Sequence, residues 1–439
     1  MKVFKFGGTS VGSPANMRSV MEIITDGEPK IVVLSAMSGT TNTLVEISNN
    51  LYADKKGEAK SIINGLKEKY DHVVAELYKT DEYKTKGQQV VDEHFDVLFK
   101  KTEGRFNAVK EQAILAEGEL ISTALVTYLL LENGIKAALL PALDFMRIDK
   151  NKQADVPAIK ELIKPVLEQA GQQEIYITQG FICRNADGDI DNLQRGGSDY
   201  TATLVGAAIN SEEVQIWTDI DGLHNNDPRF VEKTTRVDHL LFTEAAELAY
   251  FGAKILHPLT VLPAKDANIP VRLKYTMEPS APGTLISNDK MVSGLKAIAA
   301  KDGITAIKIR SGRMLMAYGF LRKVFEVFEK YTTSIDMITT SEVAISLTID
   351  NDKYLPQILS ELNNIGEVEV DKDQTIVCVV GDMISEEKVF SKHVFEALEG
   401  VPVRMISYGG SRYNVSILIP SNFKKDTLQK LSNHLFYNE

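Results

Sequence analysis

The pattern of hydrophobic and polar positions along the chain predicts strands that alternate with helices. Short, continuous apolar runs at residues 3–6, 31–34, 137–140, 175–182 and 214–217 are typical of strands buried on both faces of a parallel sheet. Between these runs, apolar residues recur three or four positions apart, which is the spacing of helices. The sequence therefore predicts an α/β fold with an open, mainly parallel sheet that has helices on both faces.

The C-terminal third of the chain contains an internal repeat. The helix-like segment 323–329 is echoed by 393–399, and each copy has the order β-α-β-β-α of a ferredoxin-like domain. The first copy gains a last strand near 367–370, whereas the second copy runs out of chain at Glu439. We expect the unassigned strand 295–299 to complete the sheet of the second copy.

Proline and glycine residues punctuate the chain just before residue 287, where we place a domain boundary. We expect an α/β domain over residues 1–287, a first small-domain region over 294–374 and a second small domain over 375–439.

Composition narrows the class of protein. A net charge of −11, from 60 acidic and 49 basic residues, argues against binding to nucleic acid or to an acidic membrane, but not against ATP. Cys183 and Cys378 are isolated in strand-like runs, so we expect no disulfide, no metal site and a cytoplasmic protein. No apolar run approaches the roughly 18 residues of a membrane span, and the strand at the N-terminus leaves no room for a signal peptide.

A glycine-rich turn follows the first predicted strand. Lys5 is followed by Gly7 and Gly8, and Ser13 is a plausible helix N-cap with Pro14 in the first helical position. Free backbone N–H groups and the helix dipole at such a turn bind anions, and Lys5 would add a fixed positive charge. Neither standard phosphate fingerprint matches, so an ordinary tight turn with a surface lysine explains this stretch equally well.

Other polar stretches follow predicted strands, where open α/β sheets place their ligands. The loop 35–42 is rich in hydroxyl groups. Arg195, two glycines, Ser198 and Asp199 precede a helix of small residues. This pattern indicates a site for a carboxylate or phosphate. The simpler alternative is a loop that only caps the helix. Asp219, at the end of the fifth strand, suits a ribose or a hydrated magnesium ion, and an Asx turn equally.

Two further charged residues have a local explanation as well as a functional one. Glu119 is expected near the start of a helix, and Lys254 near the end of another. An acid in a first turn and a lysine in a last turn both complement the helix dipole. Local sequence alone does not separate that effect from a role in a site.

Taken together, the motifs resemble those of the aspartokinases of the amino-acid kinase superfamily over nearly the whole chain. The C-terminal repeats resemble a tandem pair of ACT domains, and residues 338–342 are similar to the family's effector-binding stretch. Because no reductase domain follows, we expect the monofunctional, lysine-sensitive type. The motifs that carry the resemblance, in the family's order, are residues 5–10, 118–119, 179–181, 195–199, 217–219, 227–229 and 251–258.

The resemblance implies ATP-dependent phosphorylation of the β-carboxylate of L-aspartate to 4-phospho-L-aspartate, the first step toward lysine, threonine and methionine. An ionised carboxylate is already a nucleophile, so the site needs alignment and charge cancellation rather than a general base. The resemblance also implies Mg²⁺ bound mainly through the phosphates, feedback control by an amino-acid effector, for which we expect lysine, and a homodimer formed through the ACT domains.

The resemblance gives the matching residues specific roles. Lys5 and Lys254 would hold the phosphates, while Gly7 and Gly8 would donate backbone N–H groups. Arg195 would bind the α-carboxylate of aspartate. Other residues would also act on the substrate aspartate. Glu119 would receive its ammonium group, Thr41 and Ser198 would hydrogen-bond it, and Asp199 would position the lysine or the substrate amine.

The nucleotide and effector sites are likewise implied by resemblance, with three departures from the family pattern. Gln194 stands where glycine is usual, His224 where tyrosine is common, and Ala317 where lysine-sensitive members often have serine. The remaining nucleotide residues would be Thr218, Asp219, Arg229 and Ile255, with His224 at the adenine. The effector residues would be Met314, Asp336, Thr340, Ser341 and Glu342.

Two alternative functions stay open at this point. One is a kinase for another acid, such as glutamate or acetylglutamate, whose members generally lack paired ACT domains. The other is an amino-acid sensor that keeps the fold without catalysis. Intact Lys5, Arg195, Asp199 and Lys254 argue against the sensor.

Overall fold

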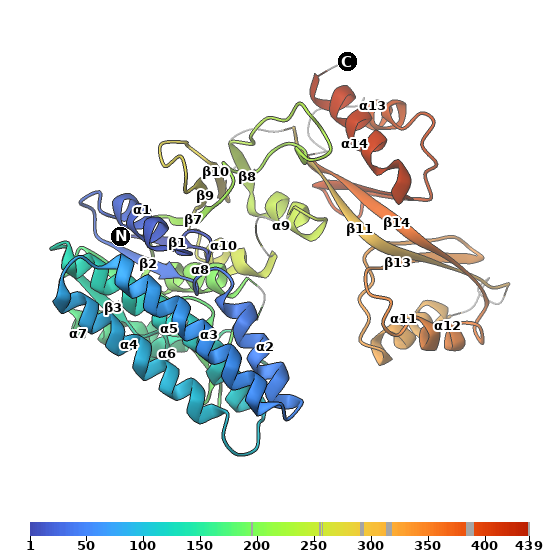
Figure 1. The fold of residues 1–439 in the computed structure, drawn as a ribbon. Helices are drawn as coiled ribbons and strands as arrows, with labels where there is room; N and C mark the ends of the chain where they lie inside the picture. The colour runs from blue at the N-terminus through green and yellow to red at the C-terminus, as the bar shows by residue number, and fades with distance from the viewer. Residues whose placement is uncertain are drawn as a thin grey trace. The chain divides into compact units, whose positions relative to one another are not determined.

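The chain forms two compact units in the computed structural model (Figure 1). The structure describes residues 1–194, 196–253, 256, 258–289, 294–312, 318–382 and 390–437. The first unit comprises Met1–Leu223 and Leu256–Asn288, and the second comprises His224–Ile255 and Asp289–Glu439.

The first unit is built on an open sheet with the strand order β3-β4-β2-β1-β7-β9-β10. Neighbouring strands are parallel except β9 and β10, which confirms the expected α/β fold. The strands are β1 (Lys2–Phe6), β2 (Lys30–Leu34), β3 (Ala137–Leu140), β4 (Ile175–Gln179), β7 (Val214–Thr218), β9 (Val271–Tyr275) and β10 (Thr284–Ser287).

The apolar run 175–182 is interrupted and does not form a single strand as expected. β4 ends at Gln179, and Phe181 adopts a left-handed backbone conformation with φ of 68°. The chain then enters β5 (Ile182–Arg184), which pairs with β6 (Ile190–Asn192) in a separate hairpin. The apolar pattern did not reveal this break because residues on both sides of it are buried.

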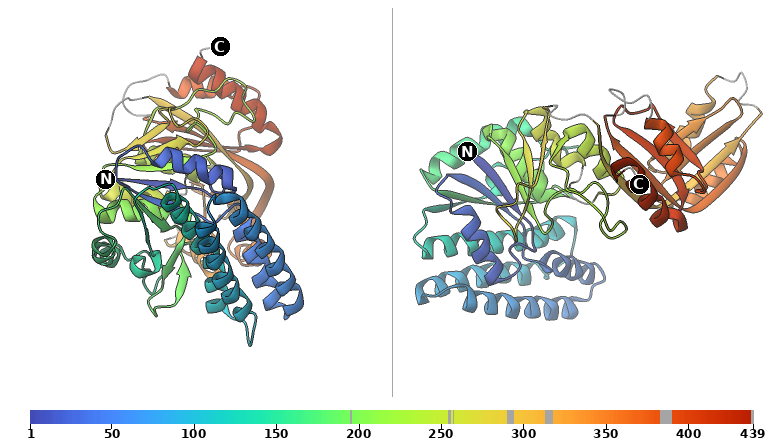
Figure 2. Two further views of the ribbon diagram at one scale, coloured as in Figure 1. Left: turned by 60° about the vertical axis from the view of Figure 1, so that its left-hand side comes forward. Right: turned by 90° about the horizontal axis from the view of Figure 1, so that it is seen from above.

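Helices cover both faces of the sheet in the first unit (Figure 2). One layer has α5 next to the sheet with α3 and α4 outside it, and the main core cluster lies between this layer and the strands. Ser13 caps α1 as expected, because its Oγ accepts a hydrogen bond from the Asn16 backbone N–H at 3.2 Å. The first layer contains α1 (Pro14–Ile24), α2 (Thr40–Tyr52), α3 (Lys56–Leu77), α4 (Asp81–Lys101) and α5 (Ala108–Glu132). The other helices are α6 (Ala142–Phe145), α7 (Val156–Ala170), α8 (Gly197–Ile209), the 3-10 turn η1 (Pro258–Val261) and α10 (Leu262–Asp266).

Helix α5 is long and apolar enough to cross a membrane by length and composition alone. This criterion averages hydropathy over a window, whereas the sequence analysis looked for a continuous apolar run, which Glu117 and Glu119 interrupt. Moreover, 78% of its apolar window is buried within the protein, as in the core helix of a globular domain. No second helix among the described residues meets the same criterion.

The second unit contains both copies of the repeat around a sheet with the order β12-β13-β11-β14-β16-β15. Each copy follows the predicted order of strands and helices. The strands are β11 (Leu295–Arg310), β12 (Ile338–Thr340), β13 (Ala344–Ile349), β14 (Glu367–Gly381), β15 (Met405–Tyr408) and β16 (Asn414–Pro420). The helices are α11 (Phe320–Lys330), α12 (Leu355–Leu362), α13 (Phe390–Ala397) and α14 (Lys424–Ser432), with the short turns η2 (Ser421–Phe423) and η3 (Asn433–Tyr437).

The long strands β11 and β14 run through both copies of the repeat (Figure 1). The first half of β11 pairs with the second half of β14, as in Ala297 opposite Val380 and Ala299 opposite Cys378. Register shifts after Lys301 separate this half from the one that pairs with β13. Residues 295–299 thus pair with the strand that the sequence analysis assigned to the second copy.

Residues 224–255 belong to the second unit, although the sequence analysis placed them in the α/β domain over 1–287. They include β8 (His239–Leu241) and α9 (Phe242–Tyr250). Val231 is 3% exposed within the apolar core of the second repeat, and the Ile298 backbone N–H donates to the Asn225 carbonyl at 2.8 Å. Residues 224–255 are grouped with the second unit because they are buried against a distant part of the chain. The prolines and glycines used to place the domain boundary in the sequence give no information about such long-range contacts.

Candidate functional site

The carboxyl ends of four neighbouring strands meet at one edge of the first unit's sheet. Phe6 of β1 lies opposite Leu34 of β2 and Trp217 of β7, and Leu34 lies opposite Gln179 of β4. The loops that follow these strands therefore emerge side by side, at the edge where open α/β sheets bind ligands. Parallel register thus brings together four polar stretches that are far apart in the sequence.

A cavity of about 250 Å³ lies among these loops. Lys5, the loop after β2, the middle of α5 and the N-terminus of α8 all contribute to its lining. Five residues of the predicted site line it, and five others join them. The lining residues are Lys5, Ser35, Thr41, Glu119, Phe181, Gln194, Gly196, Gly197, Ser198 and Asp199.

Lys5 and Asp199 form an ion pair inside this cavity. The Lys5 Nζ lies 2.7 Å from the Asp199 Oδ1, and both side chains are less than one-fifth exposed. The ion pair holds the Lys5 ammonium group in one place, although its stem is flexible. Lys5 can therefore act as a fixed positive charge, unlike a freely moving surface lysine. Gly8 follows closely, and a Cβ there would lie 2.8 Å from the Ala36 carbonyl oxygen, so the turn packs tightly against the loop after β2.

The N-terminus of α8 lines the same cavity. Gly196 is the N-cap, with φ of 70°, and Gly197 and Ser198 follow in the first turn. The Ser35 hydroxyl donates to the Ser198 Oγ at 2.9 Å, which ties the loop after β2 to this helix. A helix N-terminus of this kind favours a carboxylate or phosphate.

Glu119 lies in the middle of α5 and not in a first turn, so the local dipole explanation for it was wrong. The residue is 3% exposed, and its Oε2 has no hydrogen-bond partner among the described residues. Burial raises the pKa of the Glu119 carboxyl to about 8, although a hydrogen bond from the Ala36 backbone opposes the rise. A buried carboxyl without a cation is unfavourable unless a positive ligand supplies the charge. Among the described residues, the Glu119 carboxyl is therefore available to a cationic group.

Gly180 is required for the approach of β4 to Ser198. A Cβ at this position would lie 2.5 Å from the Ser198 Oγ and 2.9 Å from its Cα. We therefore expect Gly180→Ala to displace Ser198 and to raise the KM for the acidic substrate at least several-fold, with a loss of stability of about 1 to 3 kcal/mol from overpacking. Steady-state kinetics and thermal melting test this, and Gly65→Ala, at an exposed position of α3 with open space and an ordinary helical backbone, is the control. Unchanged KM values in Gly180→Ala would contradict the assignment of Ser198.

The predicted nucleotide residues are divided between the two units. Thr218 and Asp219 follow β7, next to β1, and the Thr218 hydroxyl donates to the Asp219 Oδ1 at 3.1 Å. His224 and Arg229 belong to the second unit. None of these four lines the cavity. Lys254 and Ile255 lie outside the described residues, as does Arg195 of the predicted aspartate site.

Arg229 is engaged within its own loop. Its Nη2 lies 2.6 Å from the Asp227 Oδ2 and its Nε 2.9 Å from the Asp227 Oδ1, while 69% of its side chain is exposed. The His224 ring contacts the Thr234 hydroxyl at 2.9 Å. An incoming phosphate would compete with Asp227 for the exposed guanidinium.

The predicted effector residues are spread over the first repeat of the second unit. Asp336 is buried, with a side chain 1% exposed, whereas Glu342 is exposed in the turn between β12 and β13. Thr340 ends β12, and the Ser341 backbone N–H donates to the Ala344 carbonyl at 2.8 Å. Met314 and Ala317 lie outside the described residues.

The predicted site residues did not include three side chains that line the cavity, Ser35, Phe181 and Gln194, although the sequence analysis noted the loop 35–42, the motif 179–181 and the departure at 194. Gln194 has φ of 59° and Phe181 φ of 68°, so both occupy the left-handed region that non-glycine residues rarely adopt. Ser35 lies directly after a strand, in the loop where the sequence analysis expected a ligand. Backbone conformation gives no comparable signal in the sequence.

No group of three or more His, Cys, Asp or Glu side chains that could hold a metal ion occurs among the described residues.

Comparison with known proteins agrees with this geometry. The Amino acid kinase family matches residues 1–275, and an ACT domain matches residues 377–435. Lysine-sensitive aspartokinase 3 of Escherichia coli is 35% identical, with 99% of each chain covered. A crystal structure of E. coli aspartokinase III in complex with aspartate and ADP (R-state) has a TM-score of 0.84 at 33% identity, covering 99% of this chain and 100% of that one. The same enzyme in complex with lysine and aspartate (T-state) has a TM-score of 0.82, with 33% identity and 99% of each chain covered.

A parallel sheet with its site at the strand ends, followed by two ACT-like repeats, defines a regulated amino acid kinase. With these relatives over its full length, the chain belongs to the aspartokinases. It is an ATP-dependent aspartate kinase with allosteric ACT domains.

Proposed function

We propose that the cavity around Lys5 and Glu119 binds L-aspartate and that its residues act in transfer of the γ-phosphoryl group of ATP to the β-carboxylate. One observation carries the proposal. A buried carboxyl that has no cationic partner among the described residues, a lysine–aspartate pair and a helix N-terminus line the same small cavity. These groups complement a zwitterionic acid at its ammonium group, its carboxylates and the arriving phosphoryl group.

In this proposal each residue has one physical task. Glu119 accepts the ammonium group of aspartate, and Arg195 binds its α-carboxylate. Lys5, held by Asp199, neutralises charge on the phosphoryl group as a bond forms from the β-carboxylate oxygen to the γ-phosphorus and the bond to ADP breaks. The other expected contributors are Thr41 and Ser198 at aspartate, Gly7, Gly8 and Lys254 at the phosphates, and Thr218, Asp219, His224, Arg229 and Ile255 at the nucleotide.

Trapping of the acyl phosphate tests this function directly. The full-length protein is incubated with ATP, Mg²⁺ and either L-aspartate or L-glutamate in the presence of hydroxylamine. We expect the aspartyl hydroxamate with aspartate and little product with glutamate. Glutamyl hydroxamate alone would indicate a kinase for another acid, and no product with either would indicate a sensor without catalysis.

The raised pKa of Glu119 makes the reaction depend on pH. Only the ionised carboxylate accepts an ammonium group, so kcat/KM for aspartate should fall about tenfold per pH unit below about pH 8 and level off above it. Initial rates at low aspartate concentration across this range measure the effect. A profile that is flat from about pH 6 to about pH 8 would contradict the role of Glu119.

The remaining parts of the proposal concern metal, effector and assembly. Mg²⁺ would be bound mainly through the phosphates, in keeping with the described residues around the cavity. We propose lysine as the feedback effector, because the E. coli relative is lysine-sensitive and has been crystallised with lysine. We further propose that the effector site contains Met314, Asp336, Thr340, Ser341 and Glu342, and enzyme assays with lysine, threonine or methionine test the effector. We also propose a cytoplasmic homodimer formed through the ACT domains, and sedimentation analysis tests its assembly.

A further inference from the structure

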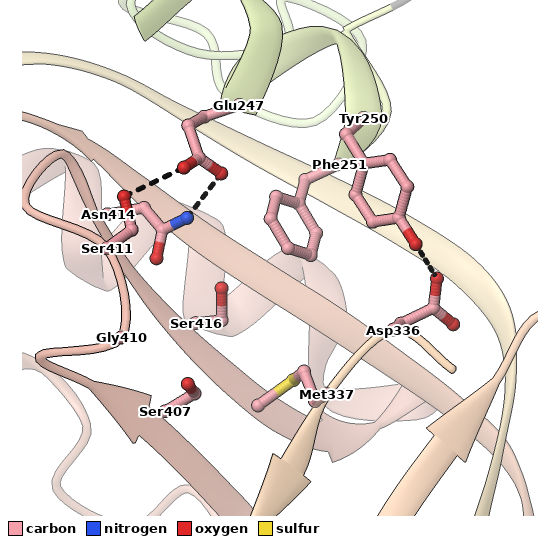
Figure 3. Close-up of a pocket in the computed structure, with 10 residues that line it drawn as sticks. All are labelled: Glu247, Tyr250, Phe251, Asp336, Met337, Ser407, Gly410, Ser411, Asn414 and Ser416. Atoms are coloured by element: carbon pink, nitrogen blue, oxygen red, sulfur yellow. Dashed lines mark hydrogen bonds between the residues drawn. The ribbon is translucent and has the colours of Figure 1, made fainter. Parts of the chain in front are cut away.

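A second cavity of about 250 Å³ lies within the second unit (Figure 3). It is enclosed by the end of α9, the segment before β12, and strands β15 and β16. Carboxylate, hydroxyl and amide groups line it together with two aromatic rings. Its lining residues are Glu247, Tyr250, Phe251, Asp336, Met337, Ser407, Gly410, Ser411, Asn414 and Ser416.

The carboxylate at the Asp336 end already has a cation. The Lys301 Nζ lies 2.9 Å from the Asp336 Oδ1 and 2.8 Å from the Asp350 Oδ2. The Tyr250 hydroxyl donates to the same Asp336 oxygen at 2.6 Å. Because this end is neutralised by the chain itself, an additional cation is less favoured here than at the opposite end.

The carboxylate at the Glu247 end has only neutral partners. The Ser411 hydroxyl donates to the Glu247 Oε1 at 2.8 Å, and the Asn414 side-chain amide donates to its Oε2 (Figure 3). No lysine, arginine or histidine among the described residues forms an ion pair with it. Two donors use about half of the lone-pair positions of a carboxylate, so the Glu247 side chain can accept another donor. An ammonium group is such a donor, and it would bring the cation that the described residues do not supply at this end of the cavity.

The walls between the two ends are suited to a short aliphatic chain. The Phe251 ring and the Met337 side chain lie between Glu247 and Asp336, and Ser407 of β15 and Ser416 of β16 line the same cavity (Figure 3). An alkyl chain can contact the ring and the thioether, while a polar end group can bind the hydroxyls. The volume matches a molecule of amino-acid size.

The wall formed by α9 is held firmly against the sheet. Gly252, directly after the helix, has φ of 111°, and a Cβ there would lie 2.3 Å from the Ala300 carbonyl oxygen of β11. Phe251 is 6% exposed. The cavity therefore does not need a large rearrangement to keep its shape, which favours binding.

From these contacts we propose that this cavity binds a small primary aliphatic amine, with its ammonium group at Glu247. The chain lies along Phe251 and Met337, and a polar group at the far end bonds Ser407 or Ser416. Of the predicted effector residues, Asp336 lines this cavity, whereas Thr340, Ser341 and Glu342 do not. The site is independent of the catalytic proposal, since the ligand is recognised wholly within the second unit.

Ligand-observed NMR titration of the full-length protein tests the proposal. The probes are 5-amino-1-pentanol, which carries an ammonium group, and 1,5-pentanediol, its neutral counterpart of the same length. We expect the amine to bind at least tenfold more tightly than the diol, because a charged hydrogen bond is lost in the diol. Glu247→Gln should weaken amine binding about tenfold or more, whereas Glu399→Gln, an exposed acid in the same unit, should leave it unchanged.

Further variants distinguish this cavity from the predicted effector residues that do not line it. Ser407→Leu fills the cavity without removing charge and should also abolish amine binding, with thermal melting of each variant as the check on folding. Glu342→Gln should retain amine binding. The proposal is overturned if the amine does not bind at millimolar concentration, if the diol binds equally well, if Glu247→Gln folds and binds like the wild type, or if Glu342→Gln alone abolishes binding. Hydroxamate formation is measured in the same preparations, so loss of catalysis is distinguished from loss of this site.

Discussion

Replacement of Lys5 by alanine is expected to lower kcat about 100- to 1,000-fold while the fold is retained. Lys5 supplies a fixed positive charge in a cavity where charge develops on the transferred phosphoryl group, and removal of one such group typically costs this much. The side chain is 12% exposed and sits at the end of β1, so its loss leaves no large apolar cavity. Initial rates at saturating ATP and aspartate, together with thermal melting, measure both parts of the prediction.

The control for Lys5 lies on the same strand. Lys2 pairs with Glu28 at 3.0 Å on the other end of β1, away from the cavity, and Lys2→Ala should keep near-normal turnover. Lys5→Arg should restore only part of the activity, because a planar guanidinium does not fit the place of a compact ammonium beside Asp199. Near-normal turnover in Lys5→Ala would remove Lys5 from the mechanism.

Replacement of Glu119 by glutamine is expected to have opposite effects on substrate binding and on stability. The KM for aspartate should rise about 100-fold, because truncation of a buried charged partner costs several kcal/mol, while kcat changes much less. The free protein should become more stable by roughly 2 to 4 kcal/mol near pH 8, because the neutral amide does not carry the cost of ionising a buried carboxyl. Kinetics and melting curves without substrate measure the two effects.

The direction of the stability effect follows from proton uptake. The Glu119 carboxyl has a pKa of about 8 in the folded chain against an ordinary value of 4.5. Between these values the folded state binds more protons than the unfolded state, so the free energy of unfolding of the wild type falls as pH rises. The advantage of Glu119→Gln should therefore be absent below about pH 4.5, grow up to about pH 8 and stay constant above it.

A neighbouring glutamate provides the matched control. Glu117 is equally buried on α5, but its Oε2 lies 2.5 Å from the His94 Nδ1. Glu117→Gln should lower stability by about 1 to 3 kcal/mol, because it weakens an existing buried interaction, and should leave the KM for aspartate nearly unchanged. Equal effects of the two substitutions would contradict the special role of Glu119.

Much of the fold follows from short-range pattern, and the exceptions have a common cause. Apolar runs located β1, β2, β3 and β7, and the duplicated segments located the two ACT-like repeats. The break at Gly180 and the left-handed Phe181 were missed, because both depend on the close approach of α8. The assignment of residues 224–255 to the second unit was also missed, since Val231 is buried in a cluster whose other members lie between Ile298 and Leu431.

The sequence by itself determined the order of elements, the repeats and the motif residues at the strand ends, because periodicity and turn chemistry act over a few residues. Tertiary structure alone decided how those residues behave. It paired Lys5 with Asp199 at 2.7 Å and buried Glu119 in the middle of a helix. Among the described residues, it gave Glu119 no cationic partner and gave Glu247 only neutral ones in a second cavity. Charge, burial and the local dielectric depend on distant parts of the chain, so they are properties of the packed structure.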